Sequence, residues 1–132
     1  MLILLPTSLG EAFDRLSILR VKLSRVKDNR KIELVRDEFS KIANSIQATI
    51  GVPLYNSIMD KYYQILIDVN FQLWGVLEEQ RQAEERRADA KYKDLAHRVT
   101  KLNDERYCIK KQINEEYDSD IKEVKEYSTV EL

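Results

Sequence analysis

The sequence predicts an all-α fold: an antiparallel four-helix bundle with coiled-coil-like seams, folded as a single helical domain over residues 1–132. The chain has only 3 glycines and 2 prolines, whereas sheet-rich folds need many turn residues. Its apolar residues recur at spacings of three and four over long segments, which is the period of an amphipathic helix. We expect helices at about residues 8–27, 30–50, 54–86 and 90–117, with short extended arms at residues 1–6 and 119–132.

The first two predicted helices have recognisable start and stop signals. Ser8, followed three residues later by Glu11, forms a capping box in which Ser8 caps the helix and the Glu11 side chain reaches back. Asp28-Asn29 ends the first helix and caps the second, and Gly51, followed closely by Pro53, ends the second helix. The apolar seams are Ala12, Leu16, Leu19, Leu23 and Val26 in the first helix, and Ile32, Val35, Phe39, Ile42 and Ile46 in the second.

Residues 55–77 form the element around which the other helices are expected to pack, because this stretch is apolar on nearly every side. Its main face consists of Tyr55, Ile58, Tyr62, Ile65, Val69, Leu73 and Val76. A second stripe of Ile67, Phe71 and Trp74 runs along the opposite side. If the other helices cover the main face, the second stripe stays exposed and marks the interface of a two-fold homodimer. The alternative is that the chain itself covers this stripe.

A polar stretch separates this element from the last helix. Residues 78–93 are rich in Glu and Arg and offer almost nothing to bury. We therefore expect a break near residues 87–90, with Asp89 as the next cap. The alternative is one continuous helix through to Tyr117, roughly 95 Å long.

Arg106 is the most informative polar residue, because its neighbours along the seam of the last helix are apolar. A buried guanidinium must be paired. The candidate partners are Asp104 and Glu105 nearby, or the flank of the first helix that carries Glu11, Arg15 and Lys22. We interpret these charges as a buried network that fixes helix register, and a ligand or active site on the same charges is the alternative. The candidate residues are Glu11, Asp14, Arg15, Lys22, Asp104, Glu105, Arg106 and Lys110.

Two enzyme-like patterns are further alternatives. Glu11 and Asp14 form an E-x-x-D that, with Glu78 and Glu79, could hold Mg²⁺ as in all-α nucleotide pyrophosphohydrolases. The E-E-x-x-E part of that family's motif is absent. A chorismate-mutase-like site would use Arg and Lys projecting into the core, and the first helix has a loosely similar D-x-L-x-x-L-x-x-x-L-x-R pattern. We predict no metal and no cofactor.

Charge and composition narrow the classes of partner. The formal net charge is −1 and the pI is about 5.9, which argues against nucleic-acid binding. No apolar run approaches the ~18 residues of a membrane span. The single cysteine, Cys108, fits a reducing compartment. We expect a cytoplasmic protein, in the host cytoplasm if its source is a virus.

Several short segments suggest a family. They are Ser8-Leu9-Gly10-Glu11 with Asp14, Ile18-Leu19 and Lys22; Asn70 with Leu73-Trp74 and Glu78; Asn103-Asp104-Glu105-Arg106 with Ile109-Lys110 and Ile113-Asn114; and Ser119 with Ile121, Glu123, Lys125 and Tyr127. In these segments the chain resembles an uncharacterised family of short helical proteins from bacteria and phages. That family usually has Lys where Arg15 stands and Gly where Asp118 stands. The resemblance implies a helical fold and carries no assigned activity.

The expected function is that of a non-enzymatic structural, assembly or interaction protein that acts as a homo-oligomer. The alternative is a small all-helical enzyme or ligand-binding domain with its site around Arg106.

The two arms are also expected to meet, because residues 2–5 are too apolar for solvent and residues 121–127 alternate like an edge strand.

Overall fold

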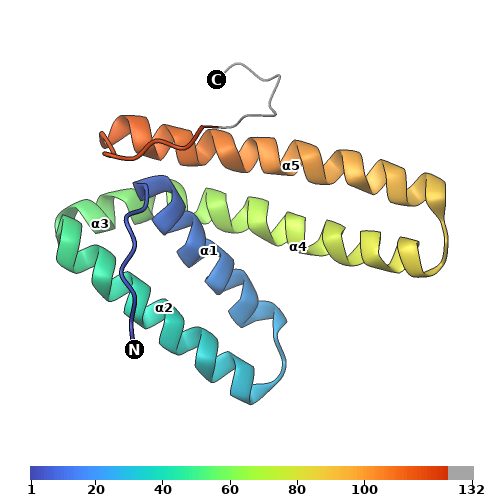
Figure 1. Cartoon of the computed structure of the whole chain (residues 1–132), viewed down its shortest axis with the longest axis horizontal. Helices are drawn as coiled ribbons and strands as arrows, with labels where there is room; N and C mark the ends of the chain where they lie inside the picture. The colour runs from blue at the N-terminus through green and yellow to red at the C-terminus, as the bar shows by residue number, and fades with distance from the viewer. Residues whose placement is uncertain (125–132) are drawn as a thin grey trace.

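The computed structural model describes residues 1–124, and all regular structure in that part of the chain is helical. The elements are α1 (Leu9–Arg25), α2 (Asn29–Ile50), α3 (Val52–Ile58), the π-helical turn η1 (Met59–Tyr63), α4 (Gln64–Glu85) and α5 (Asp89–Glu116). Because α3, η1 and α4 follow one another without a gap, they make one long helix, so the described residues form four helices (Figure 1). The predicted all-α fold is confirmed, and each helix end lies within two residues of its predicted position.

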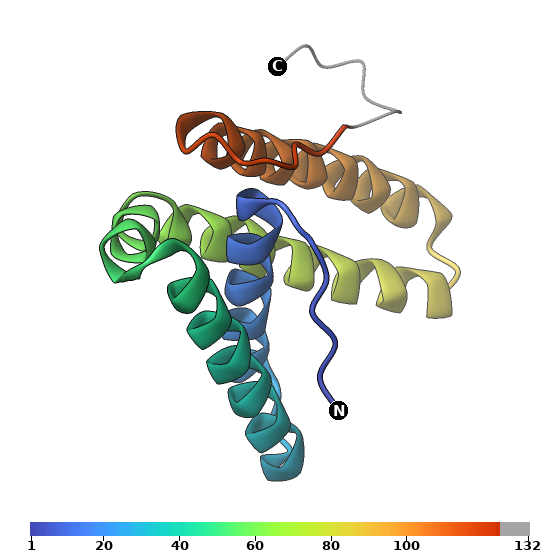
Figure 2. The same cartoon turned by 60° about the vertical axis from the view of Figure 1, so that its left-hand side comes forward.

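The helices form two antiparallel hairpins, α1–α2 and α4–α5, which cross near η1 (Figures 1 and 2). Helix α1 packs against α2, η1, α4 and α5, whereas α2 packs against α1 and α3. The long helix α3–η1–α4 packs in turn against α2 through α3, against α1 through η1 and α4, and against α5 through α4, so the other helices do pack around the apolar stretch at residues 55–77. Gly51, with a φ of 88°, turns the chain sharply between α2 and α3. Helix α2 therefore diverges from α4 and leaves one side of α4 uncovered (Figure 1).

Local signals set the starts of the first two helices, as predicted. The Glu11 N–H donates to Ser8 Oγ at 3.0 Å. The N–H groups of Arg30 and Lys31 donate to Asp28 Oδ1 at 2.9 and 3.3 Å. Each cap satisfies N–H groups that a helix start leaves without a partner.

The polar stretch after α4 contains a turn, which confirms the predicted break before the last helix. Helix α4 ends at Glu85 and α5 begins at Asp89. Arg87 adopts a φ of 54°, and the Ala88 N–H donates to the Ala83 carbonyl at 2.9 Å. Asp89 is the first residue of α5 and not its cap, which is Ala88. Its carboxylate is instead placed where the helix dipole favours negative charge.

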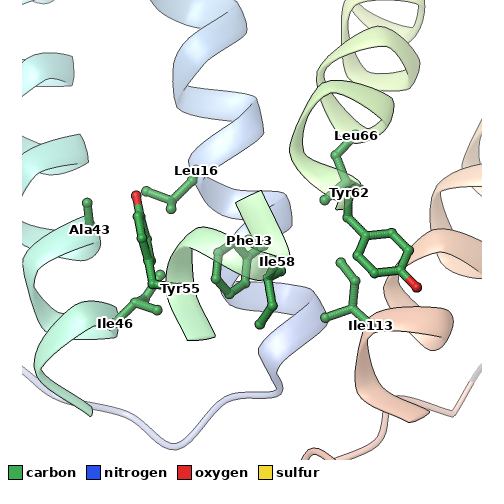
Figure 3. Close-up of a cluster of buried hydrophobic side chains, with 9 residues drawn as sticks. All are labelled: Phe13, Leu16, Ala43, Ile46, Tyr55, Ile58, Tyr62, Leu66 and Ile113. Carbon is green, nitrogen blue, oxygen red and sulfur yellow. The ribbon is translucent and has the colours of Figure 1, made fainter. Parts of the chain in front are cut away.

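Buried apolar side chains form two clusters. The first lies where α1, α2, α3 and η1 meet α4 and α5 (Figure 3), and contains Phe13, Leu16, Ala43, Ile46, Tyr55, Ile58, Tyr62, Leu66 and Ile113. The second lies between α4 and α5, and contains Val69, Leu73, Val76, Ala83, Leu95 and Leu102. The main face predicted for residues 55–77 is therefore shared between the two clusters, except that Ile65 is exposed.

The two arms do not pair in the part of the chain that the structure describes. Residues 2–5 are exposed and lack regular structure. Residues 119–124 run back along α5 (Figure 1), where the Tyr107 hydroxyl donates to the Glu123 carbonyl at 3.0 Å. The expectation that residues 2–5 lie beside residues 121–127 is wrong as far as residue 124, because α5 holds that segment. Residues 125–127 lie outside the described residues.

Gly10 lets the first turn of α1 approach the backbone of α5. A Cβ added to Gly10 would lie 2.5 Å from the Lys110 carbonyl oxygen and 3.0 Å from Asn114 Oδ1. The first of these atoms belongs to the backbone and cannot move unless α5 shifts. Any side chain at this position would therefore separate the two helices.

Gly10→Ala is expected to lower the free energy of unfolding by ~1–3 kcal/mol, the usual range for overpacking a tight contact. Gly75→Ala is the matched control, because Gly75 also lies inside a helix and an added Cβ there meets nothing within 4 Å. The control should be neutral or stabilising by up to ~1 kcal/mol, since Ala is the better helix former. Urea denaturation followed by circular dichroism measures both. Equal effects would contradict the close approach of α1 to α5.

Tyr63, the last residue of η1, has a hydroxyl oxygen that is buried and lacks a hydrogen-bond partner among the described residues. Burial raises the pKa of Tyr63 to about 12, although nearby Arg20 acts in the opposite direction. A buried polar atom without a partner costs about 1–3 kcal/mol. The hydroxyl therefore reduces the stability of the fold.

Tyr63→Phe is expected to raise the free energy of unfolding by ~1 kcal/mol at pH 7, because it removes this unpaired hydroxyl. The raised pKa means that the unfolded chain ionises first, near the ordinary pKa of 10.0, and the folded chain only near 12. Ionisation of Tyr63 thus destabilises the wild type as the pH rises from 10 through 12, and the variant should lose less stability there. Urea titrations at neutral and alkaline pH measure the difference. A loss of stability at pH 7 would indicate that the hydroxyl has a partner in solution.

Candidate functional site

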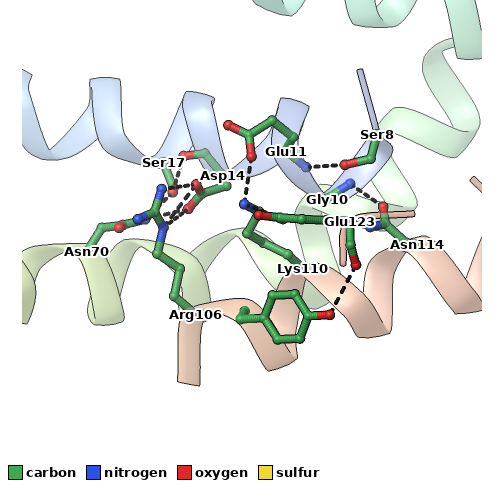
Figure 4. A network of polar contacts seen from close by, with 11 residues as sticks. Ser8, Gly10, Glu11, Asp14, Ser17, Asn70, Arg106, Lys110, Asn114 and Glu123 are labelled. Carbon is green, nitrogen blue, oxygen red and sulfur yellow. Dashed lines mark hydrogen bonds and ion pairs between the residues drawn. The ribbon is translucent and has the colours of Figure 1, made fainter. Parts of the chain in front are cut away.

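A group of polar side chains joins α1, α4 and α5 where the hairpins cross (Figure 4). This polar cluster consists of Glu11, Asp14 and Ser17 from α1, Asn70 from α4, and Arg106 and Lys110 from α5. It includes four of the residues that the sequence predicts for this region. The geometry of the cluster indicates whether these residues form a structural network or a ligand site.

The Asp14 carboxylate lies at the centre of the polar cluster, with a side chain that is 0% exposed. Arg106 Nε lies 3.0 Å from both carboxylate oxygens, and Arg106 Nη2 lies 2.5 Å from Oδ2. A guanidinium that binds both oxygens of a carboxylate makes one of the stronger ion pairs in proteins. The Arg106 side chain is 26% exposed, so the cation reaches water whereas the anion does not.

Neutral groups on α1 and α4 complete the contacts of Asp14. Asn70 Nδ2 lies 2.9 Å from Asp14 Oδ1 and 2.8 Å from Ser17 Oγ. The Ser17 hydroxyl donates to the Asp14 backbone carbonyl at 2.6 Å. Both Asn70 and Ser17 are buried. One carboxylate therefore connects three helices.

Lys110 forms a second ion pair beside the first. Its Nζ lies 2.6 Å from Glu11 Oε2 and 2.7 Å from Glu123 Oε2. The lysine is almost fully buried, whereas both carboxylates are partly exposed. The capping box predicted from the sequence would direct the Glu11 side chain back to the start of α1. In the structure this side chain binds Lys110 of α5, a charged partner and therefore a stronger one.

The first N–H groups of α1 bind side chains from the end of α5 and the residues after it. The Gly10 N–H donates to Asn114 Oδ1 at 2.7 Å, and the Leu9 N–H donates to Ser119 Oγ at 3.1 Å. A free helix N-terminus attracts anions. Because these N–H groups already have partners, the start of α1 is closed to an external anion.

The ion pairs change the pKa values of both cations. The hydrogen bond to Asp14 raises the pKa of Arg106 above its ordinary value. Burial alone would lower the pKa of Lys110, but its hydrogen bonds to Glu11 and Glu123 outweigh burial and leave that pKa raised. Neither cation can exchange a proton near neutral pH, which general acid–base catalysis would require.

The structure separates the predicted network residues into two groups. Glu11, Asp14, Arg106 and Lys110 come together in the polar cluster. Arg15 and Glu105 are exposed, and Lys22 and Asp104 are half-buried.

The partner expected for Arg106 is corrected by the structure. The sequence favours Asp104, Glu105 or the Glu11 flank, but Arg106 binds Asp14. Asp104 and Glu105 are only two and one residues away on the same helix, and residues that close do not face each other. Asp14 faces α5 because α1 crosses that helix.

Sequence reasoning missed several members of this site and its surroundings: Ser17, Asn70, Asn114, Ser119 and Glu123. A signal was present for some of them. Arg106, Lys110 and Asn114 are four residues apart and therefore share one face of a helix. Asn70 interrupts the apolar stretch at residues 55–77, where a polar side chain needs a buried partner.

The magnesium pattern proposed from the sequence does not form. Asp14 is buried against Arg106, while Glu78 and Glu79 are exposed on α4, where Glu78 Oε1 accepts from Trp74 Nε1 at 3.2 Å. Among the described residues no group of three or more His, Cys, Asp or Glu side chains could hold a metal ion. An ion at Asp14 would have to displace the Arg106 guanidinium from the carboxylate.

Two hollows lie near these residues. One, of about 210 Å³, lies beside Arg106 and Lys110 and is bordered by Glu123. The other, a groove of about 620 Å³, lies between α1 and α4 and is lined in part by Ile67 and Phe71 of the predicted interface stripe.

The predicted interface stripe is only partly covered. Phe71 is 42% exposed, with the Arg25 guanidinium carbon 4.2 Å from its ring centre. Ile67 and Trp74 are half-buried.

Across residues 1–124, no helix combines the length and the apolar character that crossing a membrane requires.

Arg106→Met is expected to lower the free energy of unfolding by ~3–5 kcal/mol, because it leaves the Asp14 carboxylate buried without its cation. Asp14→Asn should cost less, since the Arg106 side chain can turn to water. The double variant should be more stable than Arg106→Met alone, and the exposed Arg15→Met, as the control, should change stability by less than about 0.5 kcal/mol. Urea denaturation of this set measures the coupling. Small and equal losses of unfolding free energy in Arg106→Met and Asp14→Asn would contradict the difference in burial between Asp14 and Arg106.

No protein-family model, curated protein or solved structure matches this chain. The resemblance to an uncharacterised helical family therefore stays a prediction from the sequence. The function has to be inferred from the chain's own surfaces and side chains.

Proposed function

We propose that this chain is a non-enzymatic structural or assembly protein that acts as a homo-oligomer, most simply a two-fold dimer. The observation that carries this proposal is that the polar cluster is closed by its own side chains. The Asp14 carboxylate is 0% exposed and bound by Arg106 and Asn70, and Lys110 is held by Glu11 and Glu123. A catalytic or ligand site needs convergent polar groups that are open to the ligand. A closed cluster is instead suited to holding α1 on α4 and α5.

The uncovered side of α4 is the surface best suited to self-association. Phe71 and Leu77 are 42% and 44% exposed, and Trp74 lies between them along the helix. Aromatic residues are enriched at the centres of protein interfaces. A two-fold axis beside α4 would bury this side against the same side of a second copy.

The remaining expectations follow from composition. A net charge near zero supports a protein partner over nucleic acid. The single cysteine supports a reducing compartment such as the cytoplasm, or the host cytoplasm for a viral protein.

A ligand-binding domain is the second candidate, favoured by the hollow of about 210 Å³ beside Arg106 and Lys110. Both cations already have carboxylate partners. A ligand there would have to compete with Glu123 for Lys110.

Trp74→Glu is expected to convert the dimer to a monomer at tens of micromolar, because it places a charge in the contact. Phe71→Glu should act in the same way, and it stays compatible with the fold because Arg25 can pair with the new carboxylate. Leu34→Glu is the control, since Leu34 is an exposed apolar residue on α2, away from α4. Light scattering gives the mass, and circular dichroism checks the fold. A wild-type protein that is monomeric at these concentrations would refute the proposal.

A further inference from the structure

Residues 2–5 present an unusual amount of apolar surface. Leu2, Ile3, Leu4 and Leu5 are each between 69% and 77% exposed. Isolated exposed apolar side chains are common in soluble proteins, but contiguous ones usually mark an interaction site. In both views this apolar arm runs beside the α1–α2 hairpin and away from α5 (Figures 1 and 2).

The groove between α1 and α4 is the matching open surface. It measures about 620 Å³, and its apolar lining is Val21 of α1 with Ile67 and Phe71 of α4, beside the charged side chains of Arg20 and Asp68. Gln64 and Gln72 line it at positions eight residues apart on α4. No arm residue lines the groove in this structure.

We propose that the groove of one copy binds the apolar arm, residues 2–5, of a second copy, and that the exchange is reciprocal. This inference rests on the proposed function, because it names the segment that occupies part of the self-association surface.

The dimensions and chemistry of the two surfaces agree. Gln72 lies eight residues beyond Gln64, which is a rise of about 12 Å along a helix, and residues 2–5 span about 10 Å when extended. Leu5 precedes Pro6, which restricts it to extended conformations and lowers the entropy lost on binding. Gln64 Nε2 donates to Asp68 Oδ1 at 2.9 Å and Gln72 Nε2 donates to the Asp68 carbonyl at 3.3 Å. Each amide also carries a second N–H and an accepting oxygen, which can bond the backbone of an extended segment while Ile67 and Phe71 contact its side chains.

A second copy explains more of the exposed surface than the chain's own arm would. The groove shares Ile67 and Phe71 with the α4 side proposed as the dimer contact, so arm and helix contacts lie next to each other. An arm folded into its own groove would leave Trp74 and Leu77 without cover. Reciprocal exchange also suits a two-fold dimer, in which each contact is made twice.

Cysteine crosslinking tests the exchange directly, in a Cys108→Ser background that removes the native thiol. One preparation carries Leu4→Cys and a second, of different mass through a tag, carries Gln72→Cys. After the two are mixed and mildly oxidised, we expect a disulfide-linked heterodimer on a non-reducing gel. Leu34→Cys in place of Gln72→Cys is the control and should give no such product. A yield equal to the control would overturn the inference.

Two further measurements separate this inference from the proposed function. Ile3→Asp/Leu4→Asp should weaken the dimer by at least roughly tenfold in light scattering or ultracentrifugation. If these substitutions leave the dimer unchanged while Trp74→Glu dissociates it, the arm exchange is wrong and the proposed function stands. If the wild type is a monomer, both are wrong. If a single chain with Leu4→Cys and Gln72→Cys forms an internal disulfide as a dilute monomer, the arm occupies its own groove and the exchange is refuted.

Discussion

The rest of the structure depends on the buried ion pair between Asp14 and Arg106. Removing a carboxylate from water is costly, and the cost is recovered only if its hydrogen-bonding positions are filled with good geometry. Arg106 from α5 and Asn70 from α4 fill them, with Ser17 ordering the amide. Since α1 packs on α4 and α5 as well as on α2, this carboxylate holds α1 in register against the second hairpin. A shift of α1 by one turn would leave the charge buried without its partner.

The start of α1 adds a second constraint on the same crossing. Gly10 brings the helix onto the backbone of α5, and the Gly10 and Leu9 N–H groups bind Asn114 and Ser119. These hydrogen bonds have a defined direction, unlike apolar packing. They therefore specify both the position of α1 and which end of α1 faces the end of α5. Lys110 joins Glu123 to this contact, which explains why residues 119–124 follow α5 and do not meet residues 2–5.

The same arrangement leaves the apolar surface from which we infer function. Helix α2 diverges after Gly51 and packs on α1 and α3, so the side of α4 that carries Phe71 remains open. The polar cluster is buried at the crossing beside the first apolar cluster, while other apolar residues stay exposed on the arm and on α4. These exposed apolar residues are the surface on which the proposed self-association rests.

The sequence by itself determined the helices, the caps at Ser8 and Asp28, the turn after α4 and the presence of a paired Arg106. Each of these depends on residues close together in the chain, through helical period, capping and the need to pair a buried charge. Only the tertiary structure decided that Arg106 meets Asp14 and that Asn70 and Asn114 belong to the site. These contacts join residues that are 56 to 104 positions apart in the sequence. Which of them form depends on the angle at which the hairpins cross, and that angle is set by the close approach at Gly10 and the turn at Gly51.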